Sequence, residues 1–338
     1  MNARSAAILL LLLAVLGGGA LLYYQQERER RPQNIGTLGR TLLEGLRIAD
    51  VASIRIVEPK GTLTVQRRDE GWTIAERGGF PADLAQVREF VLKLAALKVG
   101  QSEPLGEKDR ARLNLDASGT QVELAGADGG ALARLTVGRK YWKREPESPE
   151  KTPADGRFIG LPAEPKQVYL VSDALAQAST RTAGWIDRSS FQVEKVKVLE
   201  VRYPDGGGYR IERSGDNADW QIEGARPGEK VDTGRANAAS YSLSLLELAD
   251  VAPKDAAGTG LDKPTLINAT TLAGRAYAIK VGSLEGESYY LSFQSSGPDE
   301  KPREKLLSQH VLLVPKAKLE DTLRKRAELL EKKQDTKK

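Results

Sequence analysis

An internal repeat is the sequence feature that most limits how this chain can fold. Two segments run through the same order of short strands, a turn that contains glycine, and a tryptophan followed by a polar residue and isoleucine. The first segment holds Trp72 and the second holds Trp220. Apolar and polar residues alternate around both tryptophans, which is typical of half-buried strands. We therefore expect two copies of one domain.

An amphipathic helix is expected after these strands in each copy. Residues 81–97 place Leu84, Val87, Phe90, Val91, Leu94 and Leu97 on one face, and residues 232–248 show the same spacing. Strands are then expected at 120–124, 131–138, 157–161 and 167–171, and in the second copy at 265–269, 275–282, 289–293 and 310–314. Each copy should end in a helix, near residues 173–180 and near 316–330, with Leu319, Leu323, Ala327 and Leu330 on one face of the latter.

Short connections between successive strands require antiparallel pairing, because parallel strands need long crossovers. The predicted fold class is therefore α+β: two tandem homologous copies, each a twisted antiparallel sheet with a packed helix. The expected boundaries are an N-terminal transmembrane anchor with its flanks at 1–31, a first repeat at 40–180, a linker at 181–190, a second repeat at 191–324 and a charged C-terminal tail at 325–338.

A long apolar run near the N-terminus begins at Ala6 and ends at Tyr24, contains no charged residue, and is followed by a charged stretch over residues 27–31. A helix of about 19 residues rises roughly 28 Å, close to the thickness of the hydrocarbon core. We therefore expect a membrane-spanning signal anchor that is not cleaved.

Two features of this segment leave alternatives open. Gly18 and Ala20 are small residues before Leu21, so a cleaved signal peptide is the competing interpretation. Positive charges lie on both sides of the span, and the positive-inside rule is weak for long translocated domains. The prediction is a single-pass protein of the bacterial inner membrane with its folded part in the periplasm.

The composition removes several kinds of chemistry. The sequence has no Cys, which excludes disulfides, thiolate metal sites and cysteine nucleophiles. Its only histidine, His310, excludes metal sites built from several histidines. Lys and Arg number 51 against 46 Asp and Glu, and the two signs are interleaved, which is typical of a solvated surface. We expect no cofactor and no nucleic-acid partner.

Residues that suggest chemistry have simpler structural explanations. His310 precedes a predicted strand and has no evident charged partner, so we expect it at a strand edge. Asp116 and Asp262 recur at the same place in both copies, which favours a role in a turn. The glycines at 206–208 precede a strand rather than a helix, and this indicates a hairpin turn rather than a phosphate-binding loop.

The repeated motifs resemble a bacterial family, domain of unknown function 4340. The matching pieces are residues 71–74 (GWTI), 115–116 (LD), 135–138 (LTVG), 168–171 (VYLV), 260–264 (GLDKP) and 279–282 (IKVG). The first copy departs from this pattern, with Asn114 where the second has Gly260 and Ala117 where the second has Lys263. The resemblance implies a membrane-anchored protein of repeated strand–helix–strand units, often encoded beside a gliding-motility-type ABC transporter. It implies no catalytic residues.

One long connection distinguishes the two copies. Residues 141–156 join two predicted strands of the first copy, whereas residues 283–287 suffice at the same place in the second. The candidate interaction residues are Tyr141, Trp142, Lys143 and Arg144, because aromatic and cationic side chains together favour recognition. The alternative is a tolerated surface insertion.

These observations favour a non-enzymatic accessory protein of a bacterial envelope complex. The family resemblance implies an ABC-type export system, with its permease and auxiliary subunits as partners and the membrane contacted through residues 6–24. The alternative is a periplasmic module that binds a glycan or peptide in the cleft between the two repeats. An envelope hydrolase is a third hypothesis.

Overall fold

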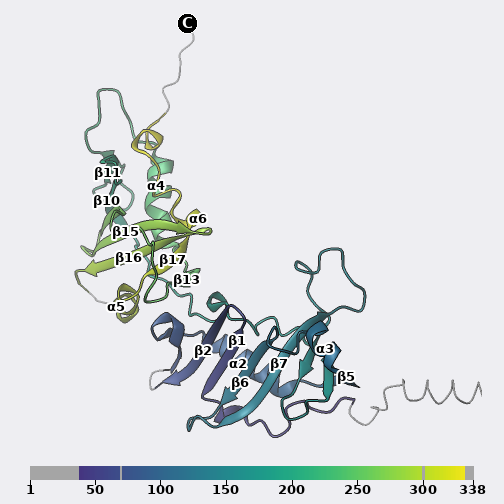
Figure 1. Cartoon of the computed structure of the whole chain (residues 1–338). Helices are drawn as coiled ribbons and strands as arrows, with labels where there is room; N and C mark the ends of the chain where they lie inside the picture. Colours follow the sequence, from purple (N-terminus) through teal and green to yellow (C-terminus); the bar gives the residue numbers. More distant parts are fainter. Residues whose placement is uncertain (1–37, 69–70, 299–300, 332–338) are drawn as a thin grey trace, which may run out of the picture. The chain divides into compact units, whose positions relative to one another are not determined.

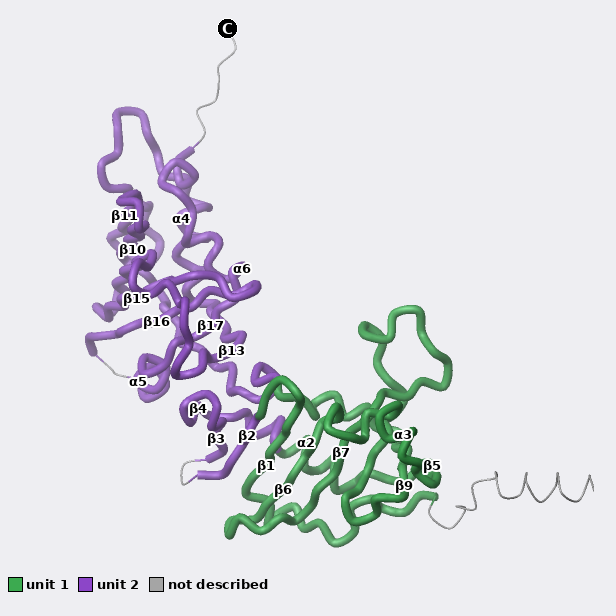
Figure 2. The backbone as a smooth tube through the Cα atoms, in the orientation of Figure 1, with its two compact units in different colours: residues 1–62, 88–180 green, residues 63–87, 181–338 purple. Residues whose placement is uncertain are grey.

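The computed structural model describes residues 38–68, 71–298 and 301–331 (Figure 1). The chain divides into two compact units. Unit 1 comprises residues 88–180 with the chain up to residue 62, and unit 2 comprises residues 63–87 with the chain from residue 181 onward (Figure 2). Unit 2 is therefore discontinuous in sequence. The structure is mainly antiparallel sheet with few helices.

The first sheet has the strand order β4-β3-β2-β1-β6-β7-β8-β9-β5 within the described residues. Its strands are β1 (Ser53–Glu58), β2 (Gly61–Arg68), β3 (Gly71–Ile74), β4 (Phe80–Pro81), β5 (Val99–Pro104), β6 (Thr120–Ala125), β7 (Ala131–Tyr141), β8 (Gly156–Gly160) and β9 (Gln167–Val171). Helices α2 (Leu84–Ala96) and α3 (Glu107–Arg112) lie before and after β5 in the chain.

The second sheet has the order β12-β11-β10-β14-β15-β16-β17-β13 within the described residues. Its strands are β10 (Val196–Arg202), β11 (Gly208–Glu212), β12 (Gln221–Ile222), β13 (Asp250–Val251), β14 (Thr265–Thr271), β15 (Ala276–Glu285), β16 (Ser288–Ser296) and β17 (Leu312–Pro315). Helices α4 (Thr233–Tyr241), α5 (Pro302–Ser308) and α6 (Lys316–Leu319) accompany it.

The two sheets have the same strand order when their strands are matched in the order in which they occur along the chain. The exception is β4, a strand of the first sheet that has no counterpart in the second. The registers also correspond. Ile54 of β1 pairs antiparallel with Leu124 of β6, and Leu199 of β10 pairs in the same way with Ala269 of β14. All four side chains are buried.

Helix α2 follows the predicted apolar pattern with one exception. Val87, Phe90, Val91, Leu94 and Leu97 are buried as expected, but Leu84 is 65% exposed. Leu84 is the first residue of the helix, and the preceding Asp83 caps it by accepting hydrogen bonds from the backbone N–H groups of Ala85 and Gln86 at 2.8 and 3.3 Å. A side chain at this position lies over the turn outside the helix rather than over its buried face.

Helix α4 is shorter than the sequence predicts. Asp232 caps it as expected, since its carboxylate accepts a hydrogen bond from the Arg235 backbone N–H at 3.1 Å. The helix ends at Tyr241 and continues only as a short 3-10 turn over Ser242–Ser244. The side-chain hydroxyls of the serines at 240, 242 and 244 each donate to the backbone carbonyl of the residue three positions earlier. These bonds compete with the regular backbone hydrogen bonds of a helix.

The helix predicted near residues 173–180 is wrong. These residues form turns in which Asp173 accepts a hydrogen bond from the Leu175 N–H at 2.7 Å, and Leu175 has a positive φ of 44°. At its end, Thr180 donates through its backbone N–H to Glu58 at 3.0 Å and through its hydroxyl at 2.6 Å. The segment is thus held by contacts with β1 rather than by helical bonds.

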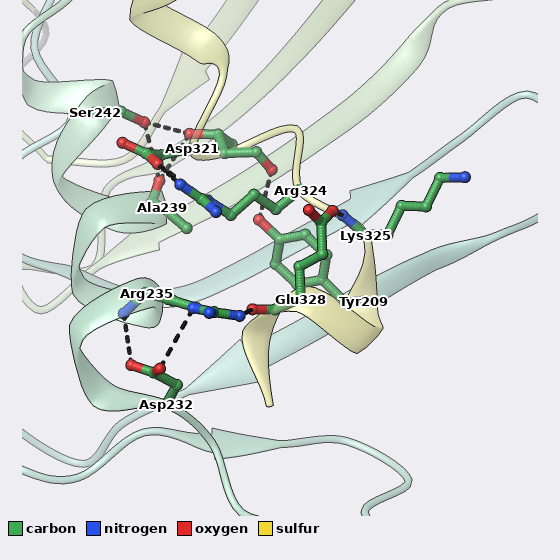
Figure 3. Close-up of polar contacts among 10 residues, drawn as sticks. Tyr209, Asp232, Arg235, Ala239, Ser242, Asp321, Arg324, Lys325 and Glu328 are labelled. Carbon is green, nitrogen blue, oxygen red and sulfur yellow. Dashed lines mark hydrogen bonds and ion pairs between the residues drawn. The ribbon is translucent and has the colours of Figure 1, made fainter. Parts of the chain in front are cut away.

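The continuous helix predicted over residues 316–330 is also wrong. Only α6 and a 3-10 turn at Arg326–Leu329 are helical, and Ala327 is exposed. The carbonyls that a helix would use internally accept hydrogen bonds from tyrosines of the neighbouring sheet. Tyr209 donates to the carbonyl of Thr322 at 2.7 Å (Figure 3). Tyr203 donates to the carbonyls of Leu323 and Arg324 at 2.8 Å.

This C-terminal segment also lies against α4. The buried hydroxyl of Thr322 donates to the carbonyl of Ala239 at 2.7 Å, and Arg235 donates to the carbonyl of Glu328 at 2.5 Å (Figure 3). Burial raises the pKa of Tyr203 to about 12 and that of Tyr209 further, which keeps both hydroxyls protonated as donors.

The predicted membrane anchor over residues 6–24 lies outside the described residues. Among the described residues, none of the helices has both the length and the apolar character needed to cross a membrane.

Candidate functional site

The connection between β7 and β8 is the long loop that distinguishes the first sheet, and it projects from unit 1 (Figure 1). In the second sheet the equivalent strands β15 and β16 are separated by only two residues, Gly286 and Glu287. Tyr141 and Gly156 pair across the base of the loop, where the backbone N–H of Asp155 donates to the carbonyl of Tyr141 at 2.9 Å. The base of the loop is therefore a regular continuation of the sheet.

The two aromatic candidates are half-buried and have structural partners. The Tyr141 ring meets the Phe158 ring edge-on, with centroids 6.0 Å apart, and Phe158 packs against a small core of Leu113, Leu115 and Val168. The Trp142 indole N–H donates to the carbonyl of Pro153 at 3.1 Å across the loop. Tyr141 thus belongs to the packing of unit 1, and Trp142 holds the loop together.

The two cationic candidates differ from the aromatic pair. Lys143 and Arg144 are exposed, and neither side chain forms an ion pair with the described residues. The backbone N–H of Lys143 donates to the Asp155 carboxylate at 2.8 Å, which fixes the chain just after Trp142. The loop therefore presents two unpaired cations from an ordered base.

A turn beside this loop contains the first of the two Leu–Asp motifs. Asp116 accepts hydrogen bonds from the backbone N–H of Ser118 at 3.0 Å and from its hydroxyl at 2.5 Å, as the predicted turn role requires. These bonds lower the pKa of Asp116. Asn114 adopts a positive φ of 53°, and its counterpart Gly260 has a φ of 67°. The two turns thus use the same left-handed position despite the Asn-for-Gly difference.

The same turn packs on a strand glycine in both sheets. The Arg139 N–H donates to the carbonyl of Leu113 at 2.8 Å, and the Ser283 N–H donates to that of Thr259 at 2.8 Å. A Cβ on Gly138 would lie 2.4 Å from the first carbonyl, and a Cβ on Gly282 would lie 2.0 Å from the second. Only glycine allows this close approach.

A cavity of about 360 Å³ lies beside the loop in unit 1, and its volume would suit a small ligand. It is lined by the turn at Ser118 and by Trp142, together with the cationic residues Arg139, Lys140 and Arg157. Burial lowers the pKa of Arg157, and the nearby charge of Glu58 opposes that shift. None of these three cations was among the candidates from sequence, although two of them directly precede Tyr141.

His310 has a packing role at the edge of β17. Its ring meets that of Phe80 edge-on at 5.2 Å, and its Nδ1 lies 3.0 Å from the carbonyl of Leu306. Within the described residues, Asp, Glu and His side chains form no group of three or more that could hold a metal ion.

Two polar clusters in unit 2 were not predicted from the sequence. Arg77 donates to Asp250 at 3.0 and 3.3 Å and to the buried Thr182 at 2.6 Å. Arg275 and Glu304 form a buried ion pair that fastens α5 to the second sheet. The members of each cluster are far apart in sequence, so no local pattern reveals them.

Comparison with known proteins identifies the family of the chain. Residues 72–264, more than half of the chain, match the family model described as Domain of unknown function (DUF4340). The match begins at the tryptophan of β3 and ends at Pro264, beside the second Leu–Asp turn. No curated protein and no solved structure matches the chain. The resemblance found in the motifs is thereby confirmed, and the chain belongs to the DUF4340 family.

Proposed function

We propose that this protein is a non-enzymatic accessory subunit that contacts a partner in a bacterial envelope complex through the loop between β7 and β8. The observation that carries the proposal is the exposed, unpaired pair Lys143 and Arg144 on a loop whose base is fixed by Tyr141 and Trp142. An ordered base lowers the entropy lost on binding, and aromatic and cationic side chains are typical of interfaces.

The partner that we propose is an ABC-type export system, with its permease or auxiliary subunit making the contact. This part of the proposal is supported by the resemblance to membrane-anchored DUF4340 proteins encoded beside such transporters. The proposed location is the inner membrane, with a single span at residues 6–24 and the folded part in the periplasm. The apolar, uncharged sequence of this segment supports the span.

We also propose that the two sheets are tandem copies of one ancestral domain. Their matching strand order supports this, as do the equivalent glycines Gly138 and Gly282 under equivalent turns. In a duplicated chain, a feature present in one copy alone is a natural place for a function gained after duplication. The loop is such a feature.

The test is co-purification from detergent-solubilised membranes. The variant K143S/R144S should lose association with the transporter subunits while its thermal unfolding stays unchanged. A matched control is R67S/R68S, which removes two exposed arginines from β2 and should retain association. Association of K143S/R144S at wild-type levels would contradict the loop as the contact. Recovery of the wild-type protein without any transporter subunit would contradict the partner.

A ligand-binding module remains the second candidate function. The observation in its favour is the cationic cavity of unit 1, which has the size of a small-ligand site.

A further inference from the structure

The cavity beside the loop brings together cations that the fold itself does not neutralise. Lys140 of β7 and Arg157 of β8 lie directly opposite each other in the register of the two strands. Like charges at such positions destabilise a sheet, because their side chains are neighbours on adjacent strands. Both residues are half-buried, so water screens the repulsion only in part.

Nearby carboxylates offset this charge only weakly. Glu145 is the acidic residue that lines the cavity, and its carboxylate lies 3.7 Å from Arg139 while remaining 73% exposed. Lys140 forms no ion pair with the described residues; its ammonium lies 5.9 Å from the centre of the Trp142 ring. Glu58 acts on Arg157 from a distance, but its carboxylate is engaged by Thr180. The lining thus keeps a surplus of positive charge.

Arg157 is held in a fixed position by the backbone. Its Nη1 donates to the carbonyl of Gly138 at 2.7 Å, and its Nε donates to the carbonyl of Ala174 at 2.9 Å. Its Nη2 makes no hydrogen bond to the described residues. A guanidinium that is anchored on one side and has a free nitrogen on the other is prepared to bind an oxyanion without further ordering.

The second sheet holds uncharged residues at the corresponding positions of its strands. Leu284 pairs with Tyr289 there, at the place of Lys140 opposite Arg157. Ser283 stands at the place of Arg139, next to the equivalent glycine Gly282. The turn and the glycine are the same in both sheets, so the fold does not require the cations.

We propose that this cavity binds an oxyanion, a carboxylate or phosphate group of a small molecule, between Arg139, Lys140 and Arg157. The anion neutralises the like-charge pair across β7 and β8. The proposal is independent of the partner contact, because Lys143 and Arg144 do not line the cavity.

The test uses the full chain in detergent, with inorganic phosphate and citrate as probes and sodium chloride at matched ionic strength as reference. Isothermal titration should show saturable binding of one anion per chain. The variant R139S/K140L, which installs the residues of the second sheet, should weaken that binding at least tenfold. The variant K143S/R144S removes the same charge from the adjoining loop and should bind within twofold of wild type. The tighter of the two probes identifies the group as phosphate or carboxylate.

The single variant K140L separates binding from folding. Without anion it should unfold at a higher temperature than wild type, since the like-charge pair is gone, yet it should bind the anion more weakly. An unchanged affinity in K140L would overturn the proposal. So would equal losses in R139S/K140L and K143S/R144S, or no saturable binding of either probe at millimolar concentration.

Discussion

Single glycines fix the turn that both sheets share. Gly138 and Gly282 each lie against a backbone carbonyl that cannot move without breaking the hydrogen bond made by the following residue. This contact explains why the motif ends in glycine after two different strand sequences. The fold therefore requires glycine at these two positions, whereas the neighbouring position of Arg139 can hold other residues.

Substitution of either glycine by alanine should destabilise the protein. The added Cβ forces the turn away from the strand, and overpacking of this kind costs about 1–3 kcal/mol. Chemical denaturation of G138A and G282A measures the loss. The control is G215A, since a Cβ on Gly215 meets nothing within 4 Å and should change stability by less than about 0.5 kcal/mol. Wild-type stability in both glycine variants would contradict the close approach.

The two tryptophans correspond in sequence but differ in strand pairing and in burial. Trp72 stands opposite Arg67, and the guanidinium of Arg213 lies 4.8 Å from the centre of the Trp220 ring. Trp220 is only 5% exposed and donates to Asn237 at 2.8 Å, whereas Trp72 is half-buried. Equal anchoring by the two residues is therefore not expected.

Truncation to alanine should reveal this difference. W220A should cost about 3–5 kcal/mol because it leaves a cavity and an unpaired Asn237. W72A should cost less, since its side chain is only partly buried. Equilibrium unfolding of the two variants in parallel provides the comparison. A larger loss for W72A than for W220A would show that burial does not decide the cost.

At the scale of elements, the loop between β7 and β8 is separable from the sheet that carries it. The pairing of Tyr141 with Gly156 closes the sheet below the loop, and the hydrogen bonds of Trp142 and Lys143 are made within the loop itself. Length beyond that pair adds little to the cost of closure, about 0.6 kcal/mol for each doubling.

Shortening the loop should therefore leave unit 1 folded. Replacing residues 143–154 by a two-residue turn, with Tyr141 and Gly156 kept, should change the unfolding free energy by less than about 1 kcal/mol. Thermal unfolding checks the fold, and co-purification checks the proposed contact. A fold lost on shortening would mean that residues 143–154 support the sheet.

The strands could be predicted from sequence more fully than the helices. Alternation located β3, which contains Trp72, and β12, which follows Trp220, because a half-buried strand imposes its period on the sequence. The segment at 316–330 carried a helical spacing of leucines, yet hydroxyls from Tyr203 and Tyr209 bind its carbonyls instead. Hydrogen bonds from residues distant in sequence cannot be recognised from the local sequence pattern.

The candidate site was predictable in part for a similar reason. The connection at residues 141–156 is longer than the corresponding connection in the second repeated segment. This difference in length identified Tyr141 to Arg144 as candidate interaction residues. The pairing of Lys140 with Arg157 was not, because the register of β7 and β8 shifts between Val137 and Lys140. A β-bulge interrupts the alternation of side chains between the two faces of the sheet, and its position cannot be predicted from the sequence pattern.

At the scale of the whole molecule, unit 2 is completed by a segment from the early part of the chain. Arg77, from residues 63–87, meets Thr182 and Asp250, and both ionised side chains of the pair are 18% exposed. The backbone adds to this, since the Asp83 N–H donates to the carbonyl of Trp185 at 2.7 Å. The predicted linker region thus holds buried residues, Trp185 among them.

A double-mutant cycle on Arg77 and Asp250 should give a coupling free energy of about 1–2 kcal/mol, because the pair is sheltered from water and bidentate. The variants are R77M, D250N and their combination, followed by urea denaturation. The control cycle is Arg134 with Glu123, a pair 60% and 30% exposed, which should give about 0.2–1 kcal/mol. Additive effects of R77M and D250N would contradict a stabilising contact.

The discontinuity of unit 2 has a consequence for biosynthesis. Residues 63–87 are translated early, but the rest of their unit follows only after residues 88–180 have been made. At about 5–20 residues per second, that delay lasts roughly 5–20 s. During this time Phe80, fully buried in the finished protein, lacks partners such as His310 that have not yet been translated. Holding chaperones therefore have a defined client segment in this nascent chain, and slow codons within residues 88–180 would lengthen its exposure.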